Sequence, residues 1–252
     1  MVDESSASVA LGEVVIVGGG CYGTFYAGQL LRARERGAAR WRRLLVVDRD
    51  PRCRAAAELP AEDGLELVAA EWGSFFDAYL ARAPRHSDPP DAIVPSPLMP
   101  HLMYEWLVRR ARDRWPGRTV EPRPVASAAG TPYDTQAPDG TRYVSFADWL
   151  CPVHCIEPTT CPVIRAPRTW EMSEAMQGLT DRLAATGPTA GPVLFTCRHR
   201  VYGVGMFDVS AVLEGDATVT AAGSGTGPSD VLVATISACH GAASLLHLGP
   251  AV

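Results

Sequence analysis

The sequence predicts an α/β fold, in which a parallel sheet with helices on both faces is followed by a loop-rich segment of cysteines and histidines. Three observations lead to this prediction. An apolar run, Val14 to Val17, leads directly into a glycine-rich turn and a helical pattern. Strand and helix patterns then alternate up to about residue 115, which is typical of a parallel sheet with crossover helices. Three cysteines lie close together near residue 155.

The first half of the chain contains four pairs of a short apolar strand and a following helix. Each strand is a run of aliphatic residues, and each helix has apolar residues at a spacing of three or four. The expected strands are 14–17, 44–47, 65–69 and 91–94, and the expected helices are 22–36, 51–59, 74–83 and 101–115.

The second half gives weaker patterns. A helical pattern covers 173–185, and apolar β-branched runs indicate strands at 193–200, 231–237 and, less regularly, 204–213. The chain is expected to close on a small helix, 240–247, and the last strands could extend the first sheet.

Changes in composition divide the chain into four expected parts. Proline, glycine and small polar residues dominate after residue 116, as in linkers. The parts are a disordered tail over 1–12, the sheet domain over 13–115, a linker or loop excursion over 116–144 and a Cys/His-containing region over 145–252.

Overall composition limits the class of protein. The net charge of −5 excludes a general nucleic-acid binder, which needs a basic excess. No apolar run approaches the length of a membrane span, and the acidic, polar N-terminus is unlike a secretory signal. We therefore predict a cytoplasmic protein whose seven cysteines are mostly reduced.

The spacing Gly18-x-Gly20-x-x-Gly23 between a strand and a helix is typical of a dinucleotide phosphate-binding turn. The first glycine permits a tight turn, the second has no Cβ to hold a pyrophosphate away, and the third lets helix and strand pack closely. The helix N-terminus would then face the phosphates. The alternative is an α/β turn without a ligand. The expected cofactor-binding residues are Gly18, Gly19, Gly20, Cys21, Tyr22, Gly23, Asp48 and Arg49.

Asp48 ends the second expected strand, where an acidic residue reads the ribose hydroxyls of NAD. It should repel the 2′-phosphate of NADP, whereas Arg49 beside it could accommodate that phosphate. The residues therefore favour NAD and leave NADP open.

Residues 14–112 resemble the nucleotide-binding domain of TrkA-type regulatory proteins and small single-Rossmann dehydrogenases, including the precorrin-2 dehydrogenase type. The resemblance is based on VVIVGGGCYG, LLVVDRDP and DAIVPSP. It implies a Rossmann-like fold and binding of NAD(H) or NADP(H), without specifying a reaction. The opening motif also resembles the entry strand of flavoproteins. FAD ranks second because no later Ala-x-Gly-Asp-like motif follows.

A second group of reactive residues follows the pattern Cys151-x3-Cys155-x5-Cys161, with three prolines between and beside them. Thiolates are ligands of zinc and of iron–sulfur clusters, although this spacing matches no standard motif. Cys239 is the favoured fourth ligand. Ordinary thiols and a redox disulfide are the alternatives. Other candidate ligands are His154, Cys197, His199 and His240.

His101 follows a loop at the carboxyl end of the fourth expected strand, where α/β sheets bind substrate. It is a candidate general acid or base, with helix capping as the alternative. The leading function is a cytoplasmic NAD(P)-dependent redox protein with a Cys-ligated iron–sulfur or zinc centre and a possible redox partner protein. The competing function is a non-enzymatic module that senses NAD(H) and reports to a regulatory partner, as the TrkA-type resemblance implies.

Overall fold

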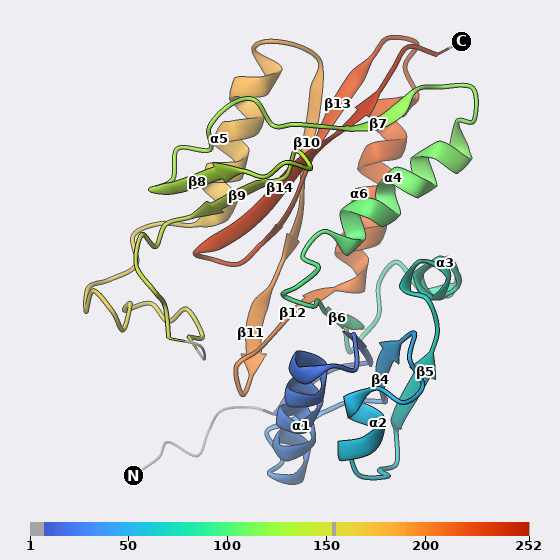
Figure 1. Ribbon diagram of the computed structural model, residues 1–252, viewed down its shortest axis with the longest axis vertical. Helices are drawn as coiled ribbons and strands as arrows, with labels where there is room; N and C mark the ends of the chain where they lie inside the picture. Colours follow the sequence, from blue (N-terminus) through green and yellow to red (C-terminus); the bar gives the residue numbers. More distant parts are fainter. Residues whose placement is uncertain (1–7, 153–154, 252) are drawn as a thin grey trace. The chain divides into compact units, whose positions relative to one another are not determined.

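The computed structural model describes residues 8–152 and 155–251 and has a mixed α/β fold, as the sequence predicts (Figure 1). The chain forms two compact units. The first unit comprises residues up to 99 together with 198–210, and the second comprises 100–197 and 211–252. Each unit has its own six-stranded sheet. The expectation of one extended sheet is therefore wrong for most late strands, because only 198–201 and 204–208 join the first sheet.

The sheet of the first unit has the order β11-β12-β6-β2-β4-β5. The pairs β2/β4, β2/β6 and β4/β5 are parallel, whereas β12 runs antiparallel to both β6 and β11. Val14 to Val17 are buried, which explains the continuous apolar run of a strand with neighbours on both sides. The strands are β2 (Glu13–Val17), β4 (Arg43–Asp48), β5 (Leu65–Ala69), β6 (Ala92–Val94), β11 (Arg198–Val201) and β12 (Val204–Asp208).

Three helices, α1 (Cys21–Glu35), α2 (Arg54–Glu58) and α3 (Trp72–Arg82), connect these strands. Ala27 and Leu30 of α1 lie fully buried in the core of the unit.

The expected tail over residues 1–12 is wrong for its described part. A short strand, β1 (Val9–Ala10), pairs with β3 (Ala39–Arg40), and Leu11 is 2% exposed. Burial of that leucine fixes the segment beside the sheet.

The second unit has a sheet of order β10-β13-β14-β9-β8, with β7 also paired to β14. Three helices belong wholly or mainly to this unit, and α5 packs on the core formed with β13 and β14. The elements are α4 (Leu102–Arg114), β7 (Val120–Arg123), β8 (Tyr133–Gln136), β9 (Arg142–Ser145), α5 (Met172–Ala184), β10 (Thr189–Thr196), α6 (Val209–Gly223), β13 (Ser229–Ile236) and β14 (His240–Leu248).

Three expectations for the second half are wrong. The supposed linker, 116–144, contains β7, β8 and most of β9, and β8 is polar and mostly exposed, so it has no apolar alternation. The expected strand 204–213 is strand β12 up to Asp208 and the start of helix α6 from Val209. The supposed closing helix, 240–247, is strand β14. Its alanines and leucines favour a helix, but pairing with β13 on one side and with β9 and β7 on the other buries them in a sheet.

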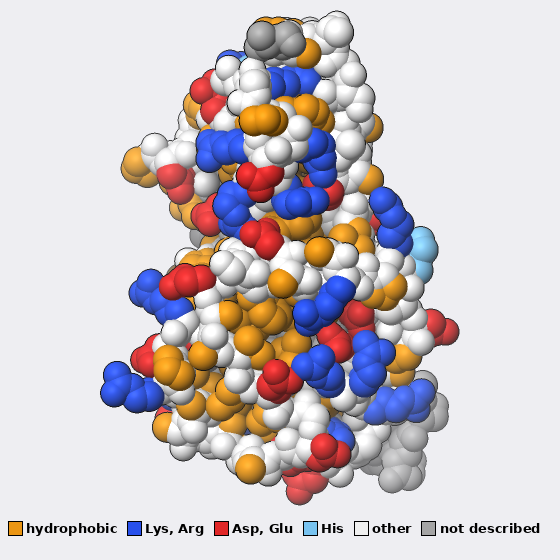
Figure 2. All heavy atoms as spheres, turned by 90° about the vertical axis from the view of Figure 1, so that its right-hand side faces the viewer, with side chains coloured by type: hydrophobic (Ala, Val, Ile, Leu, Met, Phe, Trp, Pro, Cys, Tyr) orange, Lys and Arg blue, Asp and Glu red, His pale blue; other side chains and the backbone are white. Residues whose placement is uncertain are grey.

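No helix within residues 8–152 and 155–251 is long and apolar enough to cross a membrane. On the face seen in Figure 2, arginines are interspersed with acidic side chains and do not form a single basic field.

Candidate functional site

The glycine turn, residues 18–23, joins β2 to α1 in the first unit. Gly18 has φ +85°, which L side chains rarely adopt. A Cβ on Gly23 would lie 1.7 Å from the Gly18 carbonyl oxygen, so helix and turn touch there. A Cβ on Gly20 would meet nothing within 4 Å. There is thus no room for a side chain at Gly23, whereas the space around Gly20 is open to solvent.

The N-terminus of α1 lacks a side-chain cap. Gly20 is the N-cap residue, no side chain accepts a hydrogen bond from the first turn, and no acidic residue lies in that turn. An α-helix leaves its first N–H groups, here those of Cys21, Tyr22 and Gly23, without intrahelical partners. Cys21 and Tyr22 are exposed. The helix end can therefore accept an anionic group such as a phosphate.

Asp48 is fixed against the glycine turn by backbone hydrogen bonds. Its Oδ2 accepts the N–H of Gly19 at 2.7 Å, and its Oδ1 accepts the N–H of Asp50 at 2.9 Å. A carboxylate can accept about four hydrogen bonds, so acceptor capacity remains. A cavity of about 60 Å³ lies beside it, lined by Asp48, Pro51, Cys53, Leu67 and neighbouring residues. Arg49 is exposed next to this group. The structure thus brings the expected cofactor-binding residues together.

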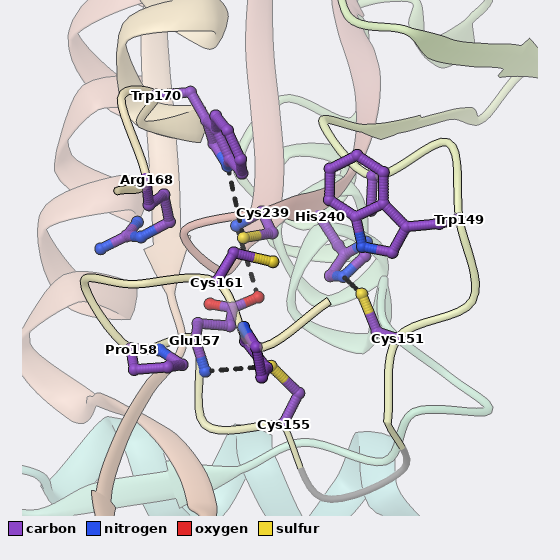
Figure 3. Close-up of a pocket in the computed structure, with 12 residues that line it drawn as sticks. Trp149, Cys151, Cys155, Glu157, Pro158, Cys161, Arg168, Trp170, Cys239 and His240 are labelled. Atoms are coloured by element: carbon purple, nitrogen blue, oxygen red, sulfur yellow. Dashed lines mark hydrogen bonds between the residues drawn. The ribbon is translucent and has the colours of Figure 1, made fainter. Parts of the chain in front are cut away.

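The thiol pocket lies in the second unit and is drawn in Figure 3. The loop after β9 supplies most of its residues, the β13–β14 turn supplies Cys239, and the first residue of β14 is His240. Four of the expected metal ligands, Cys151, Cys155, Cys161 and Cys239, line it together with the alternate His240. The pocket is also lined by Ala147, Trp149, Glu157, Pro158, Pro162, Arg168 and Trp170.

His240 is positioned by Ser145. Residues 240 and 145 are cross-strand partners of β14 and β9, and His240 Nδ1 lies 2.9 Å from Ser145 Oγ. Ser145 Oγ lies within donating distance of the Ala147 carbonyl, and a hydroxyl that donates there accepts from Nδ1–H. In that tautomer Nε2 keeps its lone pair, and it lies 3.8 Å from Cys151 Sγ. Sequence reasoning missed Ser145, because only the strand register places it beside His240.

Glu157 ties the cysteine loop to the β13–β14 turn. Its carboxylate accepts hydrogen bonds from Ser237 Oγ at 2.6 Å, Ala238 N at 2.8 Å and Cys239 N at 3.3 Å. Its backbone adopts φ +52°, which is uncommon for a residue with a side chain. These hydrogen bonds hold the cysteine loop and the β13–β14 turn together.

Burial and neighbouring negative charge raise the pKa values of two pocket thiols, Cys151 and Cys239. Burial is the largest cause for Cys151, followed by the charges of Cys155, Cys161 and Glu157. Burial also raises the pKa of Cys239 to about 11, although the indole N–H of Trp170 opposes that rise. Cys151 and Cys239 are therefore protonated at neutral pH unless a cation compensates their charge.

The other candidate ligands lie elsewhere. Cys197 is a half-buried residue between β10 and β11, and burial raises its pKa to about 12. His199 belongs to β11 in the first unit. His154 lies outside the described residues. Among residues 8–152 and 155–251, no group of three or more His, Cys, Asp or Glu side chains converges closely enough to hold a metal ion as they stand.

His101 is the N-cap residue of α4 in the second unit, as the capping alternative places it, but its side chain makes no capping hydrogen bond. The residue is 9% exposed, and both ring nitrogens are buried without a hydrogen-bond partner in the described structure. Burial lowers its pKa to about 4. Its ring neighbours are Tyr104 and Tyr143. His101 is therefore a neutral imidazole in an aromatic environment.

Comparison with known proteins gives a family match that covers most of the second unit and residues 198–210 of the first. Residues 103–249 match the model of the AF_1314_C family, described as "Uncharacterized protein, C-terminal domain". Searches of curated proteins and of solved structures find no match. The matched segment covers more than half of the chain and includes the whole thiol pocket. Through this segment the chain belongs to the AF_1314_C family.

Proposed function

We propose that the protein is an NAD(P)-dependent redox protein whose first unit is a Rossmann-like dinucleotide-binding domain. The open space over Gly20, beside a tight contact at Gly23, is the observation on which this proposal depends. A side chain at residue 20 would fit the free protein, so packing alone does not require glycine there. Close approach of a pyrophosphate does require it.

The surrounding geometry supports the same ligand. The parallel order β6-β2-β4-β5 places β2 centrally, with the glycine turn at its carboxyl end. The uncapped N-terminus of α1 favours a diphosphate, and Asp48 ends the adjacent strand β4. A bound nicotinamide dinucleotide would supply hydride transfer. Asp48 would accept the ribose hydroxyls, and its negative charge favours NAD over NADP.

In this proposal the second unit supplies a metal centre in the thiol pocket, either zinc or an iron–sulfur cluster. Four thiols and an imidazole line one small pocket, and such soft donors bind these metals. If the pocket binds no metal while the dinucleotide binds, the NAD(H)-sensing module becomes the better description.

The test is a titration of NAD(H) and NADP(H) followed by tryptophan fluorescence or calorimetry. Gly20→Val should abolish binding of both cofactors without unfolding the protein, because its side chain enters open space in the free turn. Gly28→Val is a matched control in the same helix, since a Cβ at residue 28 also meets nothing within 4 Å. Unchanged affinity in Gly20→Val would contradict the proposal. Tighter NADP(H) binding by the native protein would assign the selectivity to Arg49.

A further inference from the structure

We infer that the thiol pocket binds a single zinc ion with Cys151 and His240 as two of its ligands, and that two of the other pocket thiols, Cys155, Cys161 and Cys239, complete the site. This inference depends on the proposed metal centre and specifies its occupant and two of its ligands. It does not depend on dinucleotide binding.

The orientation of His240 is the first reason. A metal-binding histidine usually donates its other ring N–H to a fixed acceptor, which sets its tautomer. Ser145 Oγ is such an acceptor for Nδ1–H, and the Ser145 hydroxyl is itself fixed by Ala147 N–H and C=O. The lone pair of Nε2 therefore faces the pocket beside Cys151 Sγ.

The separation of these two atoms is the second reason. Tetrahedral zinc with Zn–S of about 2.3 Å and Zn–N of about 2.0–2.1 Å places adjacent S and N ligands roughly 3.6 Å apart. The observed distance between Cys151 Sγ and His240 Nε2 is 3.8 Å. These two donors thus already form one edge of a zinc tetrahedron, and His240 is exposed, so an ion can reach it from solvent.

The size of the pocket is the third reason. The space inside it that the centre of a water-sized sphere can reach is about 10 Å³. A single ion therefore needs less rearrangement of the pocket than a cluster of several iron and sulfide atoms. The thiol side chains must still turn toward the ion, because no three of the described donors converge on one point as they stand.

The other three thiols belong to the same set of possible ligands. Cys239 Sγ accepts the indole N–H of Trp170 at 3.4 Å, and such a contact stabilises a thiolate without preventing metal binding. Cys155, Cys161 and Cys239 all line the pocket with Cys151 and His240, and two of them are needed to complete a tetrahedral site.

The backbone and an indole already provide N–H groups for a thiolate site. Cys155 Sγ accepts the backbone N–H of Glu157 at 3.4 Å. The Trp149 indole nitrogen is buried close to Cys151, where its N–H favours the thiolate, although it forms no hydrogen bond of normal geometry. N–H groups directed at sulfur stabilise the charge that metal binding creates.

The experiment is metal analysis of the full-length protein purified without oxygen, followed by chelation and titration with Zn²⁺, with Co²⁺ as a spectroscopic probe. One zinc per chain is expected, with negligible iron and sulfide. His240→Gln and Cys151→Ser should each weaken zinc binding by more than about 100-fold, and Ser145→Ala by about 10–100-fold. Ser145→Thr should restore the affinity, because the hydroxyl is kept. Of Cys155→Ser, Cys161→Ser and Cys239→Ser, two should lose the zinc and one should retain it, and Cys197→Ser is the matched control outside the pocket.

Several results would overturn the inference. These are full zinc content in His240→Gln, full zinc content in two or more of the variants Cys155→Ser, Cys161→Ser and Cys239→Ser, an iron–sulfur spectrum, or a metal-free protein with a disulfide in the pocket. Circular dichroism of each variant, and chelation of the native protein, separate metal loss from misfolding. NAD(H) titration of the same samples keeps the two proposals distinct, because failed dinucleotide binding with intact zinc affects only the proposed redox function.

Discussion

The glycine turn and the thiol pocket differ in how their residues are brought together. Most of the turn is one continuous segment, and Asp48 joins it from the adjacent parallel strand. The thiol pocket combines a loop with a turn about eighty residues further on, and Glu157 and Ser145 make its connections across that separation. A local motif depends on backbone geometry, whereas a site assembled from distant segments depends on strand register and polar contacts.

The largest expected effect on stability is at the glycine turn. Gly23→Ala places a Cβ 1.7 Å from the Gly18 carbonyl oxygen, so the turn must open. We expect a loss of about 3 kcal/mol in the free energy of unfolding of the first unit. Thermal melts followed by circular dichroism measure it, and Gly20→Ala is the control. Equal melting temperatures for the two variants would show that the turn is not constrained as described.

Glu157→Ala tests the connection between the cysteine loop and the β13–β14 turn. The change removes three hydrogen-bond acceptor contacts to the β13–β14 turn and should cost about 2 kcal/mol. Faster backbone hydrogen exchange should appear at residues 155–161 and 237–240, with the glycine turn unchanged. Glu157→Gln should be milder, because its amide oxygen still accepts. Unchanged exchange in Glu157→Ala would mean that the pocket is held together by other contacts.

His101 should make the free energy of unfolding depend on pH. Its folded pKa of about 4 lies below the ordinary value of 6.5, so the unfolded state binds the proton first as the pH falls. The part of the free energy of unfolding that depends on a neutral His101 is present above pH 6.5. It is lost between pH 6.5 and 4, by at most about 3 kcal/mol. Denaturant unfolding at several pH values measures this slope.

His101→Phe should flatten the pH dependence and leave the neutral-pH stability similar or higher, since no hydrogen bond is removed. A steep acid dependence that persists in this variant would assign it to other groups.

The smallest effect is a difference in thiol reactivity. Cys21 is exposed, whereas burial raises the pKa of Cys197 and Cys239 to about 12 and about 11. In a brief iodoacetamide pulse at pH 7.5, mass spectrometry should find Cys21 labelled well before those two. NAD(H) should protect Cys21, and Zn²⁺ should protect Cys151. Protection of both thiols by one ligand would contradict two separate sites.

Sequence patterns located the elements of the first unit closely. Expected strands and helices match β2, α1, β4, β5, α3 and β6 within about two residues, because each element carries a complete apolar pattern of its own. The glycine turn could be predicted for the same reason, because the backbone conformations that require glycine all lie within six consecutive residues. Helix α6 and strands β7, β8 and β14 were missed or misassigned. Their residues have weak or contrary local preferences, and pairing or packing with distant segments decides their structure.

By itself the sequence determined the α/β class, the strand–glycine–helix turn and the list of thiols that could act together. Only the tertiary structure decided that Cys239 and His240 lie beside the 151–161 loop, in a sheet separate from that of the glycine turn. The reason is the register of β9 with β14, which pairs Ser145 with His240 and sets the exposed nitrogen of that ring beside Cys151. A one-residue shift in this register would turn these side chains to opposite faces, and nothing in the local sequence specifies it.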